Sequence, residues 1–467
     1  MMSFFRCVAD DFDDQHLGSR SVTSCGIQVL PSGSWTNRYP SATTTFASEH
    51  QLNASTSEGA PRRLLHVCAV RAVAQKSRFG LWVPEWFSGC SENADLGEVH
   101  SRAFRMGACT GRVPRSTIRT EKREEHTMTT PLTDLGVRLP VIAAPMAGGA
   151  TTTAMVIAAA GAGSLGLLAA GYKTPDALEA EIATVRAASV PFGVNVFAPN
   201  PVPIDADTYR RYAELVQAEA DRYGLTLPAN PIDDDDAFDA KVELLRADPV
   251  PVVSFTFGLP GTDVIRALQK VGTTVVQTVT SVPEAEAAAA AGIDMLAVQA
   301  AVAGGHSGTF SPDRMPAPVP LPDLVSQVVR KVRLPLIAAG GLGTVEDVRT
   351  VLNAGAAAAA VGTVLLRAEE SGASATHKAA LADPSRTETV LTRAFTGRPA
   401  RGLRNRFIDR FEGSAPLGYP AIHHLTSPLR KAAAAAGEAD LVHLWAGTGH
   451  RHAAEKPTAT ILAGLAG

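Results

Sequence analysis

From Met128 onward, the hydrophobic positions fall into short runs separated by alanine-rich segments with helical periodicity. Such runs, rich in Val, Leu and Ile and nearly free of charge, are typical of parallel strands buried on both faces. We expect eight strands, with these bounds: Leu139–Met146, Ser164–Ala169, Phe192–Phe197, Val250–Phe257, Thr274–Val279, Met295–Gln299, Leu334–Ala339 and Ala358–Leu365.

The segments between the runs predict helices, and two of them carry clear start signals. Thr174 precedes Pro175, which is an N-cap followed by proline at the first helical position, and Thr344 with Asp347 has the spacing of a capping box. The expected helices are Thr152–Ala160, one that opens at Thr174, then Asp205–Ala220, Thr262–Val271, Pro283–Ala291, Leu321–Val332 and Thr344–Ala354.

This alternation predicts an α/β fold, the (β/α)8 TIM barrel, over residues 128–467. A doubly wound sheet fits less well, because the GxGxxG at Gly161, Gly163 and Gly166 precedes its strand instead of following it. Residues 199–249 are long for one crossover, so we expect an insertion with extra helices over the rim of the barrel. Residues 367–467 follow the last strand, and we expect them to form a C-terminal cap over the active face.

Residues 1–127 differ in composition from the rest of the chain. All five cysteines lie there, no helical or strand periodicity is sustained, and Ser, Thr and Arg are frequent. We expect a low-order N-terminal extension, with Met128 as the natural start. A small cysteine-bearing domain is the alternative interpretation.

Charge and motifs narrow the class of partner. Lys and Arg number 43 against 46 for Asp and Glu, and a net charge of −3 gives no global positive field for nucleic acid or an anionic membrane. Residues 139–172 contain no charged residue, but Pro140 and Pro145 break them into short runs, so no membrane helix is expected. Without a CxxC pair, an HExxH motif or a signal peptide, we expect no metal site and a cytoplasmic protein that acts on a small molecule.

Candidate chemistry lies where the strands end, because active sites of this fold occupy the carboxyl face of the barrel. The third strand carries Asn195, and the sixth ends at Gln299. Glycines follow the seventh and eighth strands, where they let backbone N–H groups approach a phosphate. The residues of this expected phosphate cradle are Gly340, Gly341, Gly362 and Thr363. Glycines that merely turn the chain are the alternative.

His306 lies in a glycine-flanked loop shortly after the sixth strand. A lone histidine is often only a surface or core residue. At the catalytic face, however, an imidazole is suited to take a proton from a weak carbon acid. No triad or cysteine nucleophile accompanies it, so hydrolysis is poorly supported.

In combination, these motifs resemble the nitronate monooxygenase family, formerly called 2-nitropropane dioxygenases, which are FMN-dependent TIM barrels. The resemblance runs from about Thr133 to Ala446 and rests on PVIAAPMAGG, FGVNVF, VQAAVAGGHSG, PLIAAGGLG, VGTVLL, FTGRPARGLRN and LWAGTG. It implies that His306 is the catalytic base. It also implies flavin contacts from Ala144, Pro145, Met146, Asn195, Gln299 and Gly304, and phosphate contacts from Gly340, Gly341, Gly362 and Thr363, with Ala360 and Val361 as further cofactor-binding residues.

The chain departs from the family pattern at a few positions that bear on flavin contacts and substrate subclass. Ala300 and Val302 stand where many members have glycine and glutamate, and Ala360 stands where many have glutamine. Four further positions or segments are candidates to line or gate the pocket: Tyr172, His423, His424 and the arginines between residues 401 and 406.

The resemblance implies that molecular oxygen oxidises alkyl nitronates, such as propionate 3-nitronate, to a carbonyl compound and nitrite. Two alternatives are an FMN-dependent enoyl-acyl-carrier-protein reductase that uses NAD(P)H and a non-catalytic flavin- or phosphate-binding barrel. The expected partners are therefore a small nitronate and oxygen, with no nucleic acid and no membrane, while a homodimer is left open.

Overall fold

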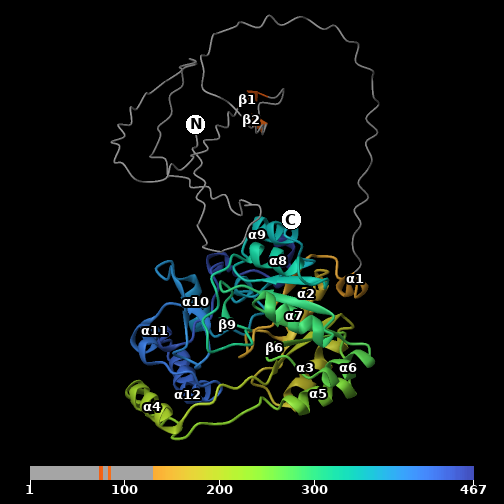
Figure 1. The fold of residues 1–467 in the computed structure, drawn as a ribbon. Helices are drawn as coiled ribbons and strands as arrows, with labels where there is room; N and C mark the ends of the chain where they lie inside the picture. Colours follow the sequence, from red (N-terminus) through yellow and green to blue (C-terminus); the bar gives the residue numbers. More distant parts are fainter. Residues whose placement is uncertain (1–72, 77–81, 86–129) are drawn as a thin grey trace, which may run out of the picture. The chain divides into compact units, whose positions relative to one another are not determined.

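The computed structural model describes residues 73–76, 82–85 and 130–467 (Figure 1). The chain divides into two compact units, residues 1–120 and 121–467. In the first unit, β1 (Val73–Lys76) and β2 (Trp82–Glu85) pair antiparallel. Apart from these strands, the expectations of a low-order extension over residues 1–127 and of a start at Met128 lie outside the described residues.

Eight parallel strands close into a barrel, which confirms the predicted fold. Each strand pairs with the next along the chain, and the last pairs with the first. The strands are β3 (Val141–Ala143), β4 (Gly166–Ala169), β5 (Phe192–Ala198), β6 (Val252–Phe257), β7 (Thr274–Val279), β8 (Met295–Gln299), β10 (Leu336–Ala339) and β11 (Ala358–Val361). β3 and β11 are shorter than expected because the backbone turns away after Ala143 and after Val361.

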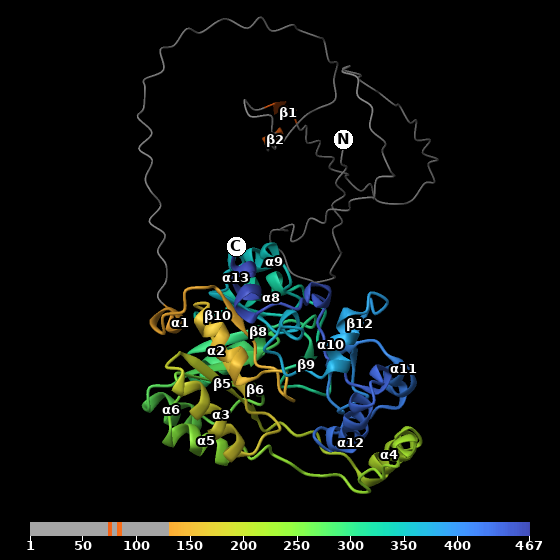
Figure 2. The ribbon, with the colours of Figure 1, turned by 180° about the vertical axis from the view of Figure 1, so that it is seen from behind.

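Helices surround the barrel where the sequence places them (Figures 1 and 2). Thr174 caps its helix by accepting from the Ala177 N–H, and Thr344 forms the expected capping box with Asp347. The helices are α2 (Thr153–Gly161), α3 (Pro175–Ala187), α6 (Thr262–Lys270), α7 (Val282–Ala291), α8 (Leu321–Val329) and α9 (Val345–Asn353).

Successive residues along the strands alternate between two apolar clusters. Ile142 and Leu167 belong to the smaller cluster, which Leu132 of α1 (Pro131–Asp134) joins. Val141 and Leu168 belong to the larger cluster, which also holds the buried faces of the surrounding helices. This alternation is typical of a filled barrel with helices packed outside it.

A third apolar cluster forms the core of a separate cap. It holds α10 (Ala375–Ala382), α11 (Arg406–Phe411) and α12 (Ala421–Ala435). A three-stranded sheet in the order β12 (Thr389–Thr392), β13 (Ala400–Leu403), β9 (Gly305–His306) links this cap to the loop after β8.

The insertion between β5 and β6 differs from the expectation. Its first helix, α4 (Ala206–Ala220), lies along α12 and buries Tyr209 and Tyr212 in the cap core instead of covering the rim (Figure 2). Its second helix, α5 (Phe238–Ala247), packs on the barrel beside α3 and α6. The last helix, α13 (Thr458–Ala466), also returns to the barrel, so the cap does not extend to the end of the chain.

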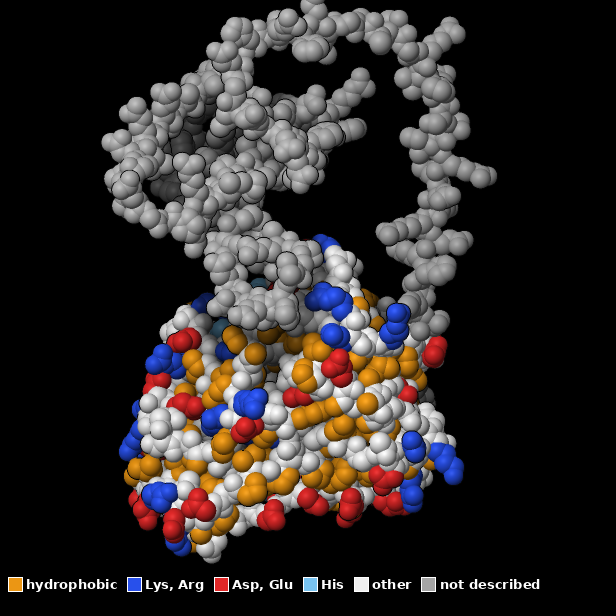
Figure 3. Space-filling view, viewed as in Figure 1, with side chains coloured by type: hydrophobic (Ala, Val, Ile, Leu, Met, Phe, Trp, Pro, Cys, Tyr) orange, Lys and Arg blue, Asp and Glu red, His pale blue; other side chains and the backbone are white. Residues whose placement is uncertain are grey.

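The surface carries charges of both signs, interspersed with small apolar areas on the face seen in Figure 3. Within the described residues, no helix combines the length and apolarity needed to cross a membrane. The expected cytoplasmic location stays a prediction.

Candidate active site

Strands β5, β6 and β7 carry a row of polar side chains. The Asn195 amide nitrogen donates to Ser254 Oγ at 2.8 Å and to Thr256 Oγ1 at 3.0 Å. The Thr256 hydroxyl lies 3.3 Å from that of Thr278 on the next strand. The amide nitrogen of Asn195 is thus committed to β6, and its carbonyl oxygen is the group left for a ligand. Sequence reasoning identified Asn195 but missed both threonines, which no motif marks.

Gln299, at the end of β8, holds the loop that carries His306. Its side-chain nitrogen donates to the His306 carbonyl at 3.2 Å, and its oxygen accepts from the Gly308 N–H at 2.7 Å. Since a primary amide carries two N–H donors, one remains for a ligand. Gln299 therefore acts first as an anchor of the loop.

The cap fixes the other side of this loop, at the junction of cap and barrel (Figure 1). His306 pairs with Ala400 of β13, and the Ser307 N–H donates to the Pro399 carbonyl at 2.9 Å. Glu284 at the start of α7 accepts from the Thr309 hydroxyl and from the Phe310 N–H, both at 2.8 Å. His306 is therefore held from three sides, as a preorganised catalytic group requires.

The hydrogen bonds of Thr396 favour one tautomer of His306. Its Nε2 lies 2.9 Å from the Thr396 hydroxyl, which itself donates to the Arg398 carbonyl at 3.3 Å. Because a hydroxyl has one hydrogen to donate, Thr396 accepts from a protonated Nε2. Nδ1 then carries the lone pair. Nδ1 makes no hydrogen bond within the described residues. It is also not one of their fully buried nitrogens without a partner, so it is free to accept a proton.

Two buried arginines lie close to this imidazole. The Arg398 guanidinium is fully buried and donates to the carbonyls of Ser307, Thr309 and Asn200. Arg430, 4% exposed, donates to the Thr426 hydroxyl and to the His423 carbonyl.

Neither arginine forms an ion pair with a carboxylate within residues 130–467. Burial lowers the pKa of each to about 10, so both stay charged at neutral pH. An unpaired buried cation is costly in a folded protein, and an anion bound nearby would offset that cost.

The same surroundings keep the imidazole neutral. Burial, together with the positive charges of Arg398 and Arg430, lowers the pKa of His306 to about 3. A neutral ring with a free Nδ1 can accept a proton, but a pKa this far below neutrality makes it a weak base unless a bound anion raises that pKa. A negative charge that developed on a bound substrate would be stabilised by the same two cations.

Aromatic rings enclose the space around His306. Its ring centroid lies 5.7 Å from Phe257, 5.7 Å from Tyr419 and 5.4 Å from Trp445. Tyr172 stacks on His423 with centroids 4.1 Å apart, and its hydroxyl lies 3.2 Å from that of Tyr419.

Two of the pocket-lining candidates, Tyr172 and His423, thus belong to this enclosure. His424 instead pairs with Asp234 at 2.9 Å, on the acidic segment of the insertion. Arg401 donates to the Ala301 carbonyl at 2.7 Å, and Arg404 and Arg406 form ion pairs away from His306. The arginines that do contribute, Arg398 and Arg430, were missed.

The loops expected to hold a phosphate converge in space. A Cβ built on Gly304 would lie 2.5 Å from the Gly447 nitrogen and 2.8 Å from Thr363 Oγ1. One built on Gly341, which has φ +74°, would lie 2.9 Å from Thr448 Oγ1. Gly340, with φ +122°, lies against the backbone of Ala303. Side chains at these glycines would fill the space between the loops.

This cradle fits a phosphate in its donors as well. The N–H groups of Gly341, Gly362 and Thr363 make no hydrogen bond to any residue that the structure describes. The Thr363 hydroxyl accepts from the Gly447 N–H at 3.0 Å, so its own hydrogen is free to donate. Several free donors around a space without side chains suit the single terminal phosphate of FMN.

The remaining expected contacts lie around the first and last strands. Gly362 faces Met146 Sδ, 3.4 Å from an ideal Cβ, and Ala144 Cβ at 3.6 Å, and Pro145 lies between these two residues in the chain. The Ala360 side chain joins the cluster inside the barrel. Val361 points into the outer core, so it can contact a cofactor through its backbone alone.

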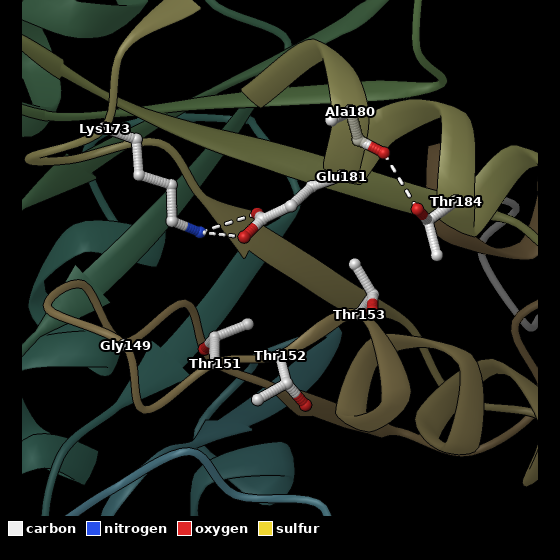
Figure 4. Close-up of a pocket in the computed structure, with 8 residues that line it drawn as sticks. All are labelled: Gly149, Thr151, Thr152, Thr153, Lys173, Ala180, Glu181 and Thr184. Carbon is white, nitrogen blue, oxygen red and sulfur yellow. Dashed lines mark hydrogen bonds and ion pairs between the residues drawn. The ribbon is translucent and has the colours of Figure 1, made fainter. Parts of the chain in front are cut away.

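Two pockets differ in their relation to this site. One of about 60 Å³ is lined by Phe197, Phe257, Tyr419 and the aspartates at positions 233–236, so it adjoins the aromatic enclosure. The other, of about 340 Å³, lies between the start of α2 and α3, where Lys173 pairs with Glu181 (Figure 4). It contains none of the expected site residues.

Comparison with known proteins agrees with this geometry. The nitronate monooxygenase family model matches residues 129–466. A probable nitronate monooxygenase from Staphylococcus aureus (strain Newman) is 36% identical over 336 residues, which make up 71% of this chain and 94% of the relative. A solved nitroalkane oxidase from Streptomyces ansochromogenes is 47% identical with a TM-score of 0.69, covering 72% of this chain and 97% of its own. FabK from Thermotoga maritima is 26% identical with a TM-score of 0.57, over 72% of this chain and 94% of its own. The chain therefore belongs to the nitronate monooxygenase family and is an oxidoreductase of that family.

Proposed function

We propose that this protein oxidises small alkyl nitronates, such as propionate 3-nitronate, with molecular oxygen and releases a carbonyl compound and nitrite. The observation that carries the proposal is a neutral His306 with a free Nδ1 beside two buried arginines that have no carboxylate partner among the described residues. A nitronate is an anion, and its parent nitroalkane is a carbon acid. This site therefore has a charge to bind the first and a base to deprotonate the second.

FMN is the proposed cofactor, and it would supply the redox chemistry of the reaction when bound. Gly341, Gly362 and Thr363 would hold its phosphate, and Ala144 and Met146 would lie beside its ring system. Asn195 and Gln299 would contribute their remaining polar groups to the ring's edge.

The chain's own residues have separable tasks in this proposal. Arg398 and Arg430 hold the substrate anion, and the aromatic enclosure around Tyr419 and Trp445 keeps water away from it. For a neutral nitroalkane, Nδ1 of His306 takes the proton from carbon, while Thr396 keeps the ring in the required tautomer.

Oxygen uptake and nitrite release, measured on the purified holoprotein, test this function. With propionate 3-nitronate we expect both, and we expect heat-released flavin to run as FMN on chromatography. Rapid oxidation of NADH coupled to reduction of an enoyl thioester, without nitrite, would instead support the reductase alternative. A protein that binds flavin but turns over neither substrate would support the non-catalytic alternative.

A further inference from the structure

Tyr172, just after β4, has a backbone conformation that its side chain disfavours. Its φ is +65°, in the left-handed region that bulky residues rarely occupy. The Tyr172 side chain nevertheless has defined contacts. Its ring stacks on His423, and its hydroxyl lies 3.2 Å from the Tyr419 hydroxyl. Such a residue persists only where its surroundings hold it in place.

Asp236 and Lys241, both from the insertion between β5 and β6, hold Tyr172. The Tyr172 N–H donates to Asp236 Oδ1 at 2.8 Å, and Asp236 Oδ2 pairs with Lys241 Nζ at 2.8 Å. Lys241 Nζ also donates to the Ala170 carbonyl at 3.0 Å, two residues before Tyr172. The ion pair therefore binds the backbone at two points of the strained turn, the Ala170 carbonyl and the Tyr172 N–H.

Stability is a poor explanation for this ion pair. The Lys241 side chain is fully buried, and removing an ammonium and a carboxylate from water costs about as much as their attraction returns. Well-packed apolar side chains in place of both residues would fill the space at no such cost. What the pair provides is a directed acceptor for the Tyr172 N–H. Asp236 also lines the small pocket beside Phe257 and Tyr419, so the insertion reaches the active site at this point.

We propose that Asp236 and Lys241 are positioning residues that set Tyr172 as a wall of the substrate pocket. This rests on the proposed function, in which the space beside His306 receives the nitronate. A determinant of substrate binding thus comes from the insertion rather than from the barrel itself.

Kinetics of Asp236→Ala in the full-length holoprotein test the proposal. We expect the KM for propionate 3-nitronate to rise about tenfold, the effect of losing one hydrogen bond to a charged acceptor. The kcat and FMN content should stay near those of the wild type, while the thermal midpoint falls because Lys241 is left buried without its carboxylate. Lys241→Met, which keeps the side-chain length, should shift KM in the same direction. Asp239→Asn alters an exposed aspartate of the same insertion that does not line this pocket, and it should leave both kinetic parameters unchanged.

A double variant separates positioning from a merely structural role. In a Tyr172→Ala background, Asp236→Ala should raise KM no further, because the residue it positions is gone. Equal effects in both backgrounds, or a loss of FMN and stability with KM unchanged, would overturn the proposal.

A crystal structure of the Asp236→Ala variant reads the positioning without any assay of activity. We expect Tyr172 to leave the left-handed region and to lose its stacking on His423. If Tyr172 keeps its conformation, the proposal is wrong whatever the kinetics show. If Tyr172 moves while the wild type turns over no nitronate, the proposed function fails and the positioning role stands.

Discussion

Replacing Thr396 with valine isolates the proton-transfer role of His306. Thr396 is fully buried, and its hydroxyl is the acceptor for His306 Nε2–H at 2.9 Å. Valine keeps the shape of threonine and deletes both that acceptor and the hydroxyl's donation to the Arg398 carbonyl. The Nε2–H would then face a methyl group, so the ring would favour the tautomer with the proton on Nδ1, which cannot act as a base.

The size of the effect follows from the cost of an unsatisfied buried donor. That cost is about 1–3 kcal/mol. At about 1.4 kcal/mol for each factor of ten, the ratio of the competent tautomer to the other falls about 5- to 150-fold. Nitrite release from a neutral nitroalkane should fall by up to the same factor. Turnover of a nitronate, which arrives without that proton, should stay near the wild-type rate.

Paired assays on a nitroalkane and its nitronate measure this difference, with Thr396→Ser as the matched control because serine keeps the hydroxyl. Nitrogen NMR of the imidazole reports the tautomer directly, even if the wild type uses nitronates alone. Wild-type nitroalkane activity in the valine variant, an equal loss on both substrates, or an unchanged tautomer would refute the reasoning.

Three further predictions concern the base, the cradle and the buried histidines. His306→Asn should retain FMN and much of the nitronate activity, but its activity on nitroalkanes should fall about 10²–10⁴-fold, as for a removed general base. Unchanged rates on both substrates would show that His306 has no catalytic role. Gly341→Asp should expel the cofactor, because it adds volume and negative charge 2.9 Å from Thr448, and retained yellow colour after gel filtration would contradict the cradle. Burial lowers the pKa of His306 to about 3 and that of His377 to about 4, from an ordinary 6.5. The unfolded chain therefore binds more protons than the folded chain below about pH 6.5. The free energy of unfolding should fall as the pH drops from about 6.5 toward about 4. If urea denaturation shows no decline in that free energy over this range, the result would contradict these pKa shifts.

Most of the barrel could be predicted because its signals are local. A buried parallel strand must be an apolar run, and a hydroxyl before a helix satisfies N–H groups within the next turn, as Thr344 does. The expected strand over residues 139–146 was too long for a different reason. Ala144 and Met146 are apolar because they lie beside Gly362, and not because they belong to a strand.

The contacts that build the cap and half of the site could not be predicted, because they join distant parts of the chain. Arg398 holds the carbonyl of Ser307, 91 positions away, and that of Asn200, 198 positions away. Nothing in the sequence near Arg398 distinguishes it from its surface neighbours, Arg404 and Arg406. The amphipathic pattern of α4 likewise predicts a buried face without saying that the cap, rather than the rim, covers it.

Anaerobic mixing of the purified holoprotein with propionate 3-nitronate, followed through the flavin absorbance, tests the central claim most directly. We expect the oxidised flavin spectrum to disappear rapidly, to return when oxygen is admitted, and to yield nitrite, while NADH at the same concentration leaves the spectrum unchanged. A spectrum that NADH bleaches rapidly and the nitronate does not would contradict the assignment of this site to nitronate oxidation.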